Sequence, residues 1–330
     1  MRYVLGIDAG GTHTRCQIAD VEGRIVSVGY GGPANTNFIS PKDARHSVEC
    51  ALSGALKSFG RPVEVAVLAG PHLPAVTLRG MPFKVQIKKK IFVNEFEAAL
   101  AAGLQNVGGP GVVILSGTGS FCMGRNWAGE EKHTGGWGPT IGDEGSGYDL
   151  AREALAAVVR ASDGRDSRTI LTELICSRLK LSHLDGLKVL LYRQPMRRDI
   201  FAGLAECVFV AAKSGDKAAE AILRSGGRRL ARLAFPVLDQ LFGWGDAFPV
   251  ILSGGVLSRR SIVTDMINAN VKTVRPLAKV SVSAFQPVTG AVIIGLHSIG
   301  VKITGWITLN LENSKSTMNS SSGSRGNKAK

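Results

Sequence analysis

The sequence lacks several features that mark whole classes of protein. No apolar run reaches the eighteen or so residues that a membrane-spanning helix needs, so we expect no membrane partner. The five cysteines form no CxxC pair and lack the spacing of metal ligands. The amino-terminal residues show no basic and apolar leader of the kind that directs secretion. We therefore expect a cytoplasmic protein with reduced thiols, not one held together by disulfides.

Aromatic residues are scarce as well, at 6% of the 330 residues, although the formal net charge is +14. A basic protein invites a nucleic-acid interpretation, but the runs Lys88–Lys90 and Arg228–Arg229 have no aromatic residues between them. None of the usual nucleic-acid motifs is present, so we expect no specific nucleic-acid partner. A basic surface also suits an anionic small molecule such as a nucleotide.

Two common nucleotide-binding motifs are absent from the glycine-rich amino terminus, YVLGIDAGGTHTRCQI. In a dinucleotide fingerprint a helix follows the glycines, whereas residues 14–19 alternate with the period of a strand. A P-loop requires a lysine, which GIDAGG lacks. The stretch therefore predicts two strands joined by a tight turn.

This turn contains the groups that a phosphate site needs. Gly10 and Gly11 allow backbone N–H groups to approach phosphate oxygens closely, and Thr12 adds a hydroxyl donor. Asp8 is suited to hold the water shell of a Mg²⁺ ion. His13 is expected to point outward. Alone such a turn is a weak signal, so a partner elsewhere in the chain matters.

A similar arrangement recurs in the second half of the chain. SGTGS at 116–120 again joins an apolar strand to a second strand, which indicates a loose internal duplication. Two similar lobes facing a cleft would place both turns on one polyphosphate, with Thr118 among the contacts. A third turn, LSGGV at 252–256, suits the nucleoside, although a plain strand-to-helix turn has the same pattern. The residues expected to contact the nucleotide there are Gly254, Gly255 and Ser258.

Periodicity and composition predict an α/β protein. The expected strands are residues 3–8, 12–20, 25–30, 63–70, 91–94, 111–126 (a strand, a turn and a strand), 250–253 and 280–282. The expected helices are residues 41–59, 95–104, a long region 151–225 with breaks near Gly164 and His183, 228–242 and 288–299. From about Asn313 the composition predicts a disordered basic tail, residues 313–330.

The motifs IDAGGT, GPAN, SGTGS, GGWGPTIGDEGSGYDLA and LSGGV, in this order, resemble the N-acetylglucosamine kinase branch of the sugar kinase, Hsp70 and actin superfamily. The sequence also resembles the wider BadF/BadG/BcrA/BcrD ATPase-like family, and archaeal broad-specificity hexokinases are similar. The resemblance covers residues 1–300, and GGWG followed by GDEGS is its most specific element. It implies a two-lobed ribonuclease H-like (actin-like ATPase) fold, with mixed sheets flanked by helices and the ligand cleft between the lobes.

The resemblance also implies how the chain is divided and what it does. The first lobe would be residues 1–94, to which a helix at about 287–300 returns, and the second would be residues 95–286. ATP and Mg²⁺ are the implied cofactors, and a homodimer is the implied assembly. The implied reaction is transfer of a phosphoryl group to the 6-hydroxyl of a hexose or amino sugar. The choice among N-acetylglucosamine, glucosamine and glucose stays open.

The catalytic position departs from the resembled kinases. They carry an aspartate directly after the strand that ends the first lobe, and the matching segment IFVNEFEAALAAG has Glu95 there. The extra methylene shifts the carboxylate by about 1.5 Å. Glu95 could still orient the attacking hydroxyl and contact the sugar, or it could only cap its helix. Glu97 is the alternative base, although two residues along a helix it points elsewhere.

Several further residues are assigned to the sugar by the resemblance. Asp143 in GDEGS should accept hydrogen bonds from sugar hydroxyls. The pocket wall and the remaining sugar contact are assigned to Gly136, Trp137, Gly138 and Asn35. Two of these assignments have an alternative: Asn37 could replace Asn35, and Trp137 could pack in the core. Glu144 fits a helix start better than a ligand contact, and His133 is expected to lie at the surface or in a loop.

Two other functions remain open. Some members of the ATPase-like family activate a dehydratase or reductase and hold an iron–sulfur cluster with cysteines at a dimer interface. This sequence has no cysteine pair of suitable spacing, and its GGWG and GDEGS motifs are of the sugar-kinase type. A non-catalytic module that senses a sugar or nucleotide is the second alternative, because Glu95 replaces the expected aspartate. Sugar binding without ATP turnover would favour it.

Overall fold

The structure is a computed structural model that describes residues 1–57, 59–70, 85–192 and 196–322. Its framework consists of two five-stranded sheets. In the first sheet the strand order is β3-β2-β1-β4-β5, with β2 antiparallel to β1 and β3, and with β4 and β5 parallel to β1. The strands are β1 (Tyr3–Ala9), β2 (Thr14–Asp20), β3 (Ile25–Gly31), β4 (Val63–Ala69) and β5 (Ile87–Val93).

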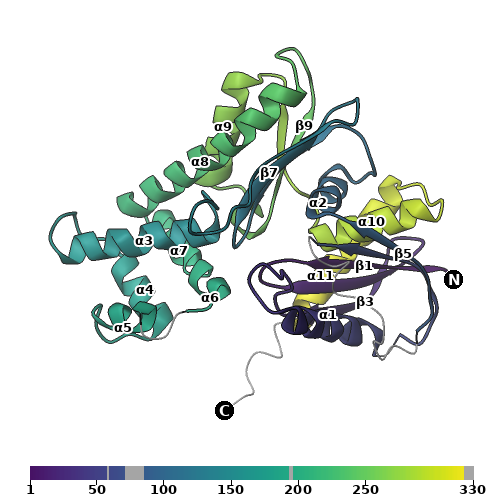
Figure 1. The fold of residues 1–330 in the computed structure, drawn as a ribbon, viewed down its shortest axis with the longest axis horizontal. Helices are drawn as coiled ribbons and strands as arrows, with labels where there is room; N and C mark the ends of the chain where they lie inside the picture. Colours follow the sequence, from purple (N-terminus) through teal and green to yellow (C-terminus); the bar gives the residue numbers. More distant parts are fainter. Residues whose placement is uncertain (58, 71–84, 193–195, 323–330) are drawn as a thin grey trace. The chain divides into compact units, whose positions relative to one another are not determined.

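Helices cover both faces of the first sheet (Figure 1). Successive side chains of β1 point to opposite faces, so Leu5 packs with α1 (Pro41–Leu56) while Val4 packs with the helices of the other face. Those helices are α2 (Glu95–Leu104) and α10 (Pro287–Ser298). The central strands are therefore buried on both sides, which explains why β1 and β4 read as nearly continuous apolar runs.

The second sheet repeats the plan of the first. Its order is β10-β9-β6-β7-β8, in which two antiparallel strands follow the first strand on one side and two parallel strands lie on the other. This repetition confirms the internal duplication and the two mixed sheets flanked by helices. The sequence pattern missed one strand, β8. The strands are β6 (Gly111–Ser116), β7 (Ser120–Arg125), β8 (Glu131–Gly135), β9 (Pro249–Ser253) and β10 (Lys279–Val282).

One long helix packs on the second sheet where a break was predicted. The predicted interruption at 225–228 is wrong, because α8 (Lys217–Leu241) runs through Gly226 and Gly227. A Cβ atom on Gly226 would come within 2.7 Å of Leu150, and one on Gly227 within 2.7 Å of Val263. These glycines let α8 approach its neighbours closely. The other elements of this part are α3 (Gly147–Ser162), α4 (Leu171–Leu179), α5 (Gly186–Tyr192), α6 (Arg198–Ala202), α7 (Ala205–Lys213), the 3₁₀ turn η1 (Gly255–Leu257) and α9 (Ile262–Val274).

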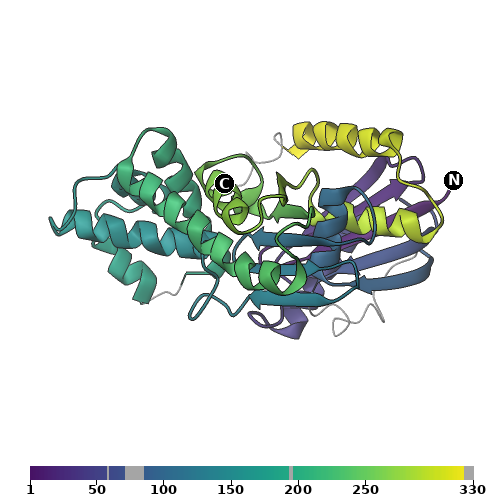
Figure 2. The ribbon, with the colours of Figure 1, turned by 90° about the horizontal axis from the view of Figure 1, so that it is seen from above.

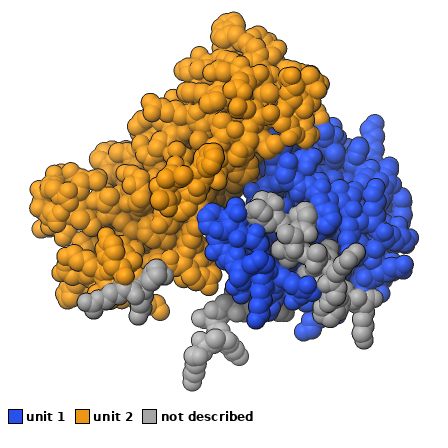
Figure 3. Space-filling model, in the orientation of Figure 1, with its two compact units in different colours: residues 1–108, 283–330 blue, residues 109–282 orange. Residues whose placement is uncertain are grey.

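The chain forms two compact units, which Figure 3 colours separately. Unit 1 comprises residues 1–108 and 283–330, and unit 2 comprises residues 109–282. The predicted boundary at 94/95 therefore differs from the observed one. The reason is that α2 packs on α10: a Cβ atom on Gly290 would lie 1.8 Å from the carbonyl oxygen of Ala98, so the two helix backbones are in direct contact.

A further helix, α11 (Gly305–Ser322), belongs to unit 1 and follows α10 in yellow in Figure 2. It extends into the segment predicted to be disordered, so that prediction is wrong for residues 313–322, and residues 323–330 lie outside the described ranges. Packing anchors the first part of this helix, because Ile307 lies against Gly23, the Asn310 amide donates to the Glu22 carbonyl at 2.7 Å, and the Ser314 hydroxyl accepts from the Ile25 N–H at 3.1 Å. In the described part of the chain, helices are either too short or too polar to cross a membrane.

Candidate active site

Two carboxylates meet at one edge of the unit 1 sheet. Strands β1, β4 and β5 are parallel, and the pairs Asp8–Ala69 and Ala69–Val93 bring their carboxyl ends into register. Asp8 stands one residue before the end of β1, and Glu95 opens α2 directly after β5. Parallel strands present their carboxyl ends at the same edge, so residues far apart in sequence reach one place.

Burial controls the charge of this pair. The pKa of Glu95 is raised to about 8. Loss of hydration is the main cause, and the negative charge of Asp8 contributes to the same rise. The pKa of Asp8 rises to about 6 through burial, against the opposing effect of Arg15. At neutral pH the pair therefore tends to retain a proton. Such an environment suits a group that takes up a proton, or a place where a cation neutralises two carboxylates.

Helix capping is carried out by other residues. The Asn94 side chain accepts a hydrogen bond from the backbone N–H of Glu97 at 2.8 Å, and the Glu97 carboxylate accepts one from the Asn94 N–H at 3.2 Å. This reciprocal capping box satisfies the start of α2. Glu95 is thus not needed as the cap, and the Glu97 carboxylate is directed back to the backbone.

The phosphate-type turn of unit 1 spans residues 10–13 between β1 and β2. Gly10 N–H donates to the carbonyl of His13 at 3.1 Å, which closes the turn. The GPAN segment lies against it, because the N–H of Ala34 donates to the carbonyl of Gly10 at 3.0 Å. Asn35 is thereby placed next to this turn, with its side-chain oxygen accepting from the N–H of Asn37 at 3.0 Å. His13 is exposed.

The glycines of the turns fall into two kinds. Gly10 and Gly11 have no positive φ, and a Cβ atom would meet nothing closer than 3.7 Å at Gly10 and nothing within 4 Å at Gly11 among the described residues. Gly117 and Gly255 in unit 2 are equally open toward the described chain. Neither backbone strain nor packing accounts for glycine at these four positions, and the backbone there is open to close approach by another group.

In unit 2 the SGTGS and SGG turns lie side by side. Strands β6 and β9 are parallel neighbours, with Leu115 opposite Ser253. Gly254 has a φ of +97°, and a Cβ atom there would lie 2.3 Å from the Ser116 carbonyl oxygen. The two turns are therefore in backbone contact at the ends of their strands. The Ser258 hydroxyl donates to the Gly255 carbonyl at 2.9 Å, within the same turn.

The GDEGS loop is fastened to the SGTGS turn from both sides. The Ser116 hydroxyl donates to the Gly145 carbonyl at 2.9 Å, and the Ser120 hydroxyl donates to the Glu144 carbonyl at 2.8 Å. Gly147 N–H also donates to the Gly117 carbonyl at 2.7 Å. Two motifs that are about twenty-five residues apart in the sequence thus form one rigid cluster in unit 2.

Asp143 lies within this cluster and is 2% exposed. Its φ is +60°, a left-handed conformation that is uncommon outside glycine. One carboxylate oxygen accepts from the N–H of Ser120 at 3.2 Å, and the other pairs with the guanidinium of Arg198. Burial raises the pKa of Asp143, while Ser120 and Arg198 lower it. Sequence reasoning missed Arg198, which lies 55 residues away and outside any motif.

A model of the BadF/BadG/BcrA/BcrD ATPase family matches residues 5–295. The chain belongs to this family. The N-acetylmuramic acid/N-acetylglucosamine kinase of Clostridium acetobutylicum is 31% identical over 306 residues, which cover 89% of this chain and 98% of that protein. The N-acetyl-D-glucosamine kinase of Dictyostelium discoideum is 27% identical over 321 residues, with coverage of 89% and 98%.

Solved structures show the same fold. A crystal structure of a proposed N-acetylglucosamine kinase from Chromobacterium violaceum superposes with a TM-score of 0.68, at 24% identity, and covers 90% of this chain and 99% of that one. The resemblance to this ATPase family that the motifs indicated is thus confirmed. The family match stops at residue 295, so α11 lies beyond it.

The other motif residues of this family member have defined surroundings. Trp137 is 75% exposed, which excludes the alternative that it packs in the core. Its neighbours Gly136 and Gly138 have φ values of +75° and +87°, so the GGWG turn needs glycine for its backbone. Glu144 does not start a helix, since α3 begins after the capping residue Ser146. His133 is exposed, as predicted, and lies on β8.

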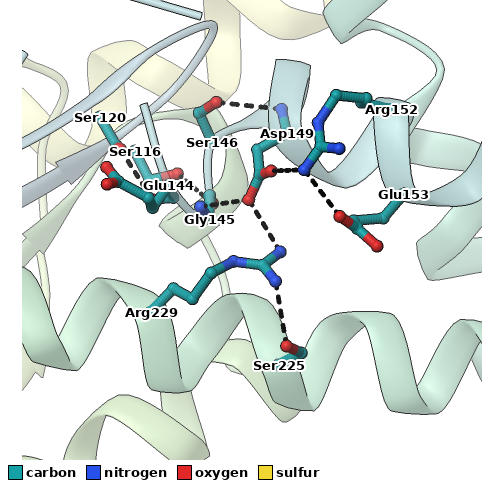
Figure 4. A network of polar contacts seen from close by, with 10 residues as sticks. All are labelled: Ser116, Ser120, Glu144, Gly145, Ser146, Asp149, Arg152, Glu153, Ser225 and Arg229. Carbon is teal, nitrogen blue, oxygen red and sulfur yellow. Dashed lines mark hydrogen bonds and ion pairs between the residues drawn. The ribbon is translucent and has the colours of Figure 1, made fainter. Parts of the chain in front are cut away.

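A polar network supports the GDEGS loop from behind (Figure 4). Asp149, in the first turn of α3, accepts a hydrogen bond from Gly145 N–H at 2.7 Å. It also pairs with Arg229 of α8 at 2.8 Å and with Arg152 of α3 at 3.0 Å. Arg229 in turn donates to Ser225 at 3.0 Å. The network connects the GDEGS loop to α3 and α8 and so supports the position of Asp143 within that loop.

Proposed function

We propose that this protein is an ATP-dependent kinase that phosphorylates the 6-hydroxyl of an amino sugar. The observation that carries the proposal is the pair of Glu95 and Asp8 at the carboxyl edge of the unit 1 sheet. The names of the two curated relatives, which align over 98% of their own lengths, support an amino sugar as the acceptor. Membership of an ATPase family supports ATP as the donor.

In this proposal Glu95 takes the place of the aspartate of the resembled kinases. Its carboxylate accepts the proton of the 6-hydroxyl as that oxygen forms a bond to the γ-phosphorus. The bond between the γ-phosphorus and its bridging oxygen breaks, and ADP leaves with the electron pair. The raised pKa of Glu95, about 8, makes it a stronger base than an exposed glutamate once it is deprotonated.

Each unit offers turns whose groups suit ATP in this proposal. Unit 1 contributes the backbone of Gly10 and Gly11 and the hydroxyl of Thr12, and the openness of this turn supports close contact with phosphate. The contributions of unit 2 come from the neighbouring SGTGS and SGG turns, through Thr118, Gly254, Gly255 and Ser258.

A divalent cation fits the chemistry of the unit 1 site. Burial raises the pKa of both Asp8 and Glu95, and a cation beside them would favour their ionised forms. Asp8 would hold Mg²⁺ through water, as this ion keeps most of its hydration shell. Bound with ATP, Mg²⁺ supplies positive charge that offsets the negative charge of the phosphates.

The amino sugar would contact Asp143, Asn35 and the GGWG turn. Asp143 offers carboxylate oxygens for sugar hydroxyls, and exposed Trp137 with Gly136 and Gly138 offers an apolar wall for the ring. An exposed indole is available to pack against the apolar face of a sugar ring.

An ADP-release assay tests the function. The purified protein is supplied with ATP, Mg²⁺ and, in turn, N-acetylglucosamine, glucosamine, N-acetylmuramic acid and glucose. We expect turnover with at least one amino sugar and a 6-phosphate as product, identified by mass spectrometry and NMR. Sugar binding with no ADP release would instead support the sensing module, and ATP hydrolysis that no sugar stimulates would support the activator ATPase.

We further propose that the enzyme is a cytoplasmic homodimer. Light scattering coupled to gel filtration should give about twice the 34.8 kDa of one chain. A monomeric mass would exclude the dimer and leave the kinase proposal intact.

A further inference from the structure

A guanidinium lies against the carboxylate assigned to the sugar. Arg198 is the first residue of α6 and pairs with Asp143, and their side chains are 19% and 3% exposed. Hydrogen bonds to a charged group are the stronger kind, and an arginine fork restricts the orientation of its partner. The two carboxylate oxygens of Asp143 are thus fixed by different elements, one by β7 through Ser120 and one by α6 through Arg198.

The SGTGS turn leaves room for this ion pair. A Cβ atom on Gly119 would come within 2.8 Å of both Asp143 oxygens and within 2.9 Å of Arg198 Nη2. Gly119 therefore differs from the open glycines of the other turn positions, because a side chain there would displace the pair. The ion pair of Asp143 and Arg198 therefore requires glycine at position 119 of the SGTGS turn.

Helix α6 is itself anchored beside the GDEGS loop. The rings of Tyr148 in α3 and Phe201 in α6 stack with a centroid distance of 4.3 Å. A Cβ atom on Gly147 would lie 3.1 Å from the carbonyl oxygen of Ala202, so the two helices meet closely. The backbone of α6 is thereby held against the start of α3, which fixes the point from which the Arg198 side chain extends.

We infer that Arg198 is a positioning residue for the sugar, which holds the Asp143 carboxylate in the orientation that accepts sugar hydroxyls. The inference rests on the proposed function. A carboxylate has about four acceptor positions, and Ser120 and Arg198 occupy one on each oxygen. Within the described structure each oxygen therefore keeps a second acceptor position, which a sugar hydroxyl would use in this proposal.

Charge supports the same role. The charged groups that act on Asp143 are Arg198, which lowers its pKa, and the neighbouring Glu144, which raises it. Without Arg198, the Ser120 N–H is the remaining group among the described residues that favours the ionised carboxylate. Asp143 would then be both less oriented and more readily protonated, and each change weakens its binding of sugar hydroxyls.

Three variants test the inference in the full-length protein. Arg198→Met removes the charge and the fork, and Arg198→Lys keeps the charge with a single point of contact. Arg197→Met is the matched control, because Arg197 is the adjacent arginine, is 66% exposed and pairs with Asp199 instead. The measurements are kcat and the KM values for ATP and for the amino sugar that the wild type uses best, with thermal unfolding in parallel.

We expect Arg198→Met to raise the sugar KM by about 10- to 100-fold and to leave the ATP KM within about twofold. Arg198→Lys should recover part of the loss, and Arg197→Met should match the wild type. A sugar KM within twofold of the wild type in Arg198→Met would overturn the inference. A parallel rise of both KM values with a lowered Tm would overturn it too, since that is the result of a purely structural role.

If Arg198→Met does not fold, Arg198→Gln serves as the uncharged variant, because glutamine is polar and its amide ends two bonds short of the Arg198 Nη atoms. An unchanged sugar KM in the folded Gln variant would likewise overturn the inference. A wild type that phosphorylates none of the sugars would show that the proposed function is wrong, and the inference would fail with it. An active wild type with an unaffected Arg198 variant shows failure of the inference alone.

Discussion

Glu95 is the residue whose protonation links the chemistry of the protein to its stability. It stands beside Asp8, both residues are half-buried, and its pKa is raised to about 8. The same shift that makes Glu95 a good proton acceptor makes its charged form costly in the folded protein. Activity and stability therefore respond to pH in opposite directions at this site.

The kinetic prediction concerns the base itself. Glu95→Gln should lower kcat by about 10²- to 10⁴-fold, the usual contribution of a general base, and leave ATP affinity within a few-fold. For the wild type, kcat/KM should rise with pH up to about 8, because the base must be deprotonated. Glu97→Gln is the control, since Glu97 caps α2. Unchanged turnover in Glu95→Gln would remove Glu95 from the mechanism.

The stability prediction follows from the sign of the shifts. The pKa of Glu95 is raised from 4.5 to about 8 and that of Asp8 from 3.8 to about 6, so the folded chain keeps protons that the unfolded chain has lost. Their contribution to stability is present below about pH 4 and is lost as the pH rises toward 8. In chemical unfolding without ligand, the free energy of unfolding of Glu95→Gln should rise relative to that of the wild type as the pH increases over this range. A pH-independent difference would contradict the shift.

At the scale of elements, glycine contacts fix how α2 and α10 pack. A Cβ atom on Gly290 would lie 1.8 Å from the Ala98 carbonyl, so Gly290→Ala forces the helices apart. Overpacking of this kind costs about 1–3 kcal/mol. Gly305→Ala is the control, because Gly305 also lies in a helix of unit 1 and has open space around it in the described structure. Equal Tm values for the two variants would show that α2 and α10 can separate without cost.

The elements also show what the sequence can predict. The hairpin of β1 and β2 was predictable, because residues 14–19 alternate and glycines precede them. The continuity of α8 was not, because Gly226 and Gly227 read as a break until their contacts with α3 and α9 are known. Arg198 gave no signal, since a single arginine in a helical region has no pattern, and only the folded chain brings it to Asp143.

At the scale of the whole molecule, the two units differ in how the chain builds them. Unit 2 is one continuous segment, residues 109–282, with its own sheet and its own core cluster. Unit 1 needs residues from both ends of the chain, because α10 has nine buried residues, five of which belong to the core cluster on that face of the sheet. A continuous segment with its own core meets the usual conditions for independent folding.

We therefore expect a fragment of residues 109–282 to be soluble and to unfold cooperatively, as followed by circular dichroism. A fragment of residues 1–108 lacks α10 and should not unfold cooperatively, because α2 alone remains on one face of its sheet and the contacts of α10 are lost. Joining residues 283–330, which include α10, to this fragment should restore cooperative unfolding. Failure of the 109–282 fragment to fold would show that unit 2 depends on unit 1.

The two kinds of glycine have a consequence for natural variation and for genetic screens. Changing Gly10, Gly11, Gly117 or Gly255 should leave cellular abundance nearly unaltered while growth that depends on the enzyme is lost, since the space beside them is open within the described structure. Changing Gly29 or Gly290 should deplete the protein itself, because their backbones touch helices. A scan that scores abundance and growth separately would thus outline the ligand surface without any ligand being known.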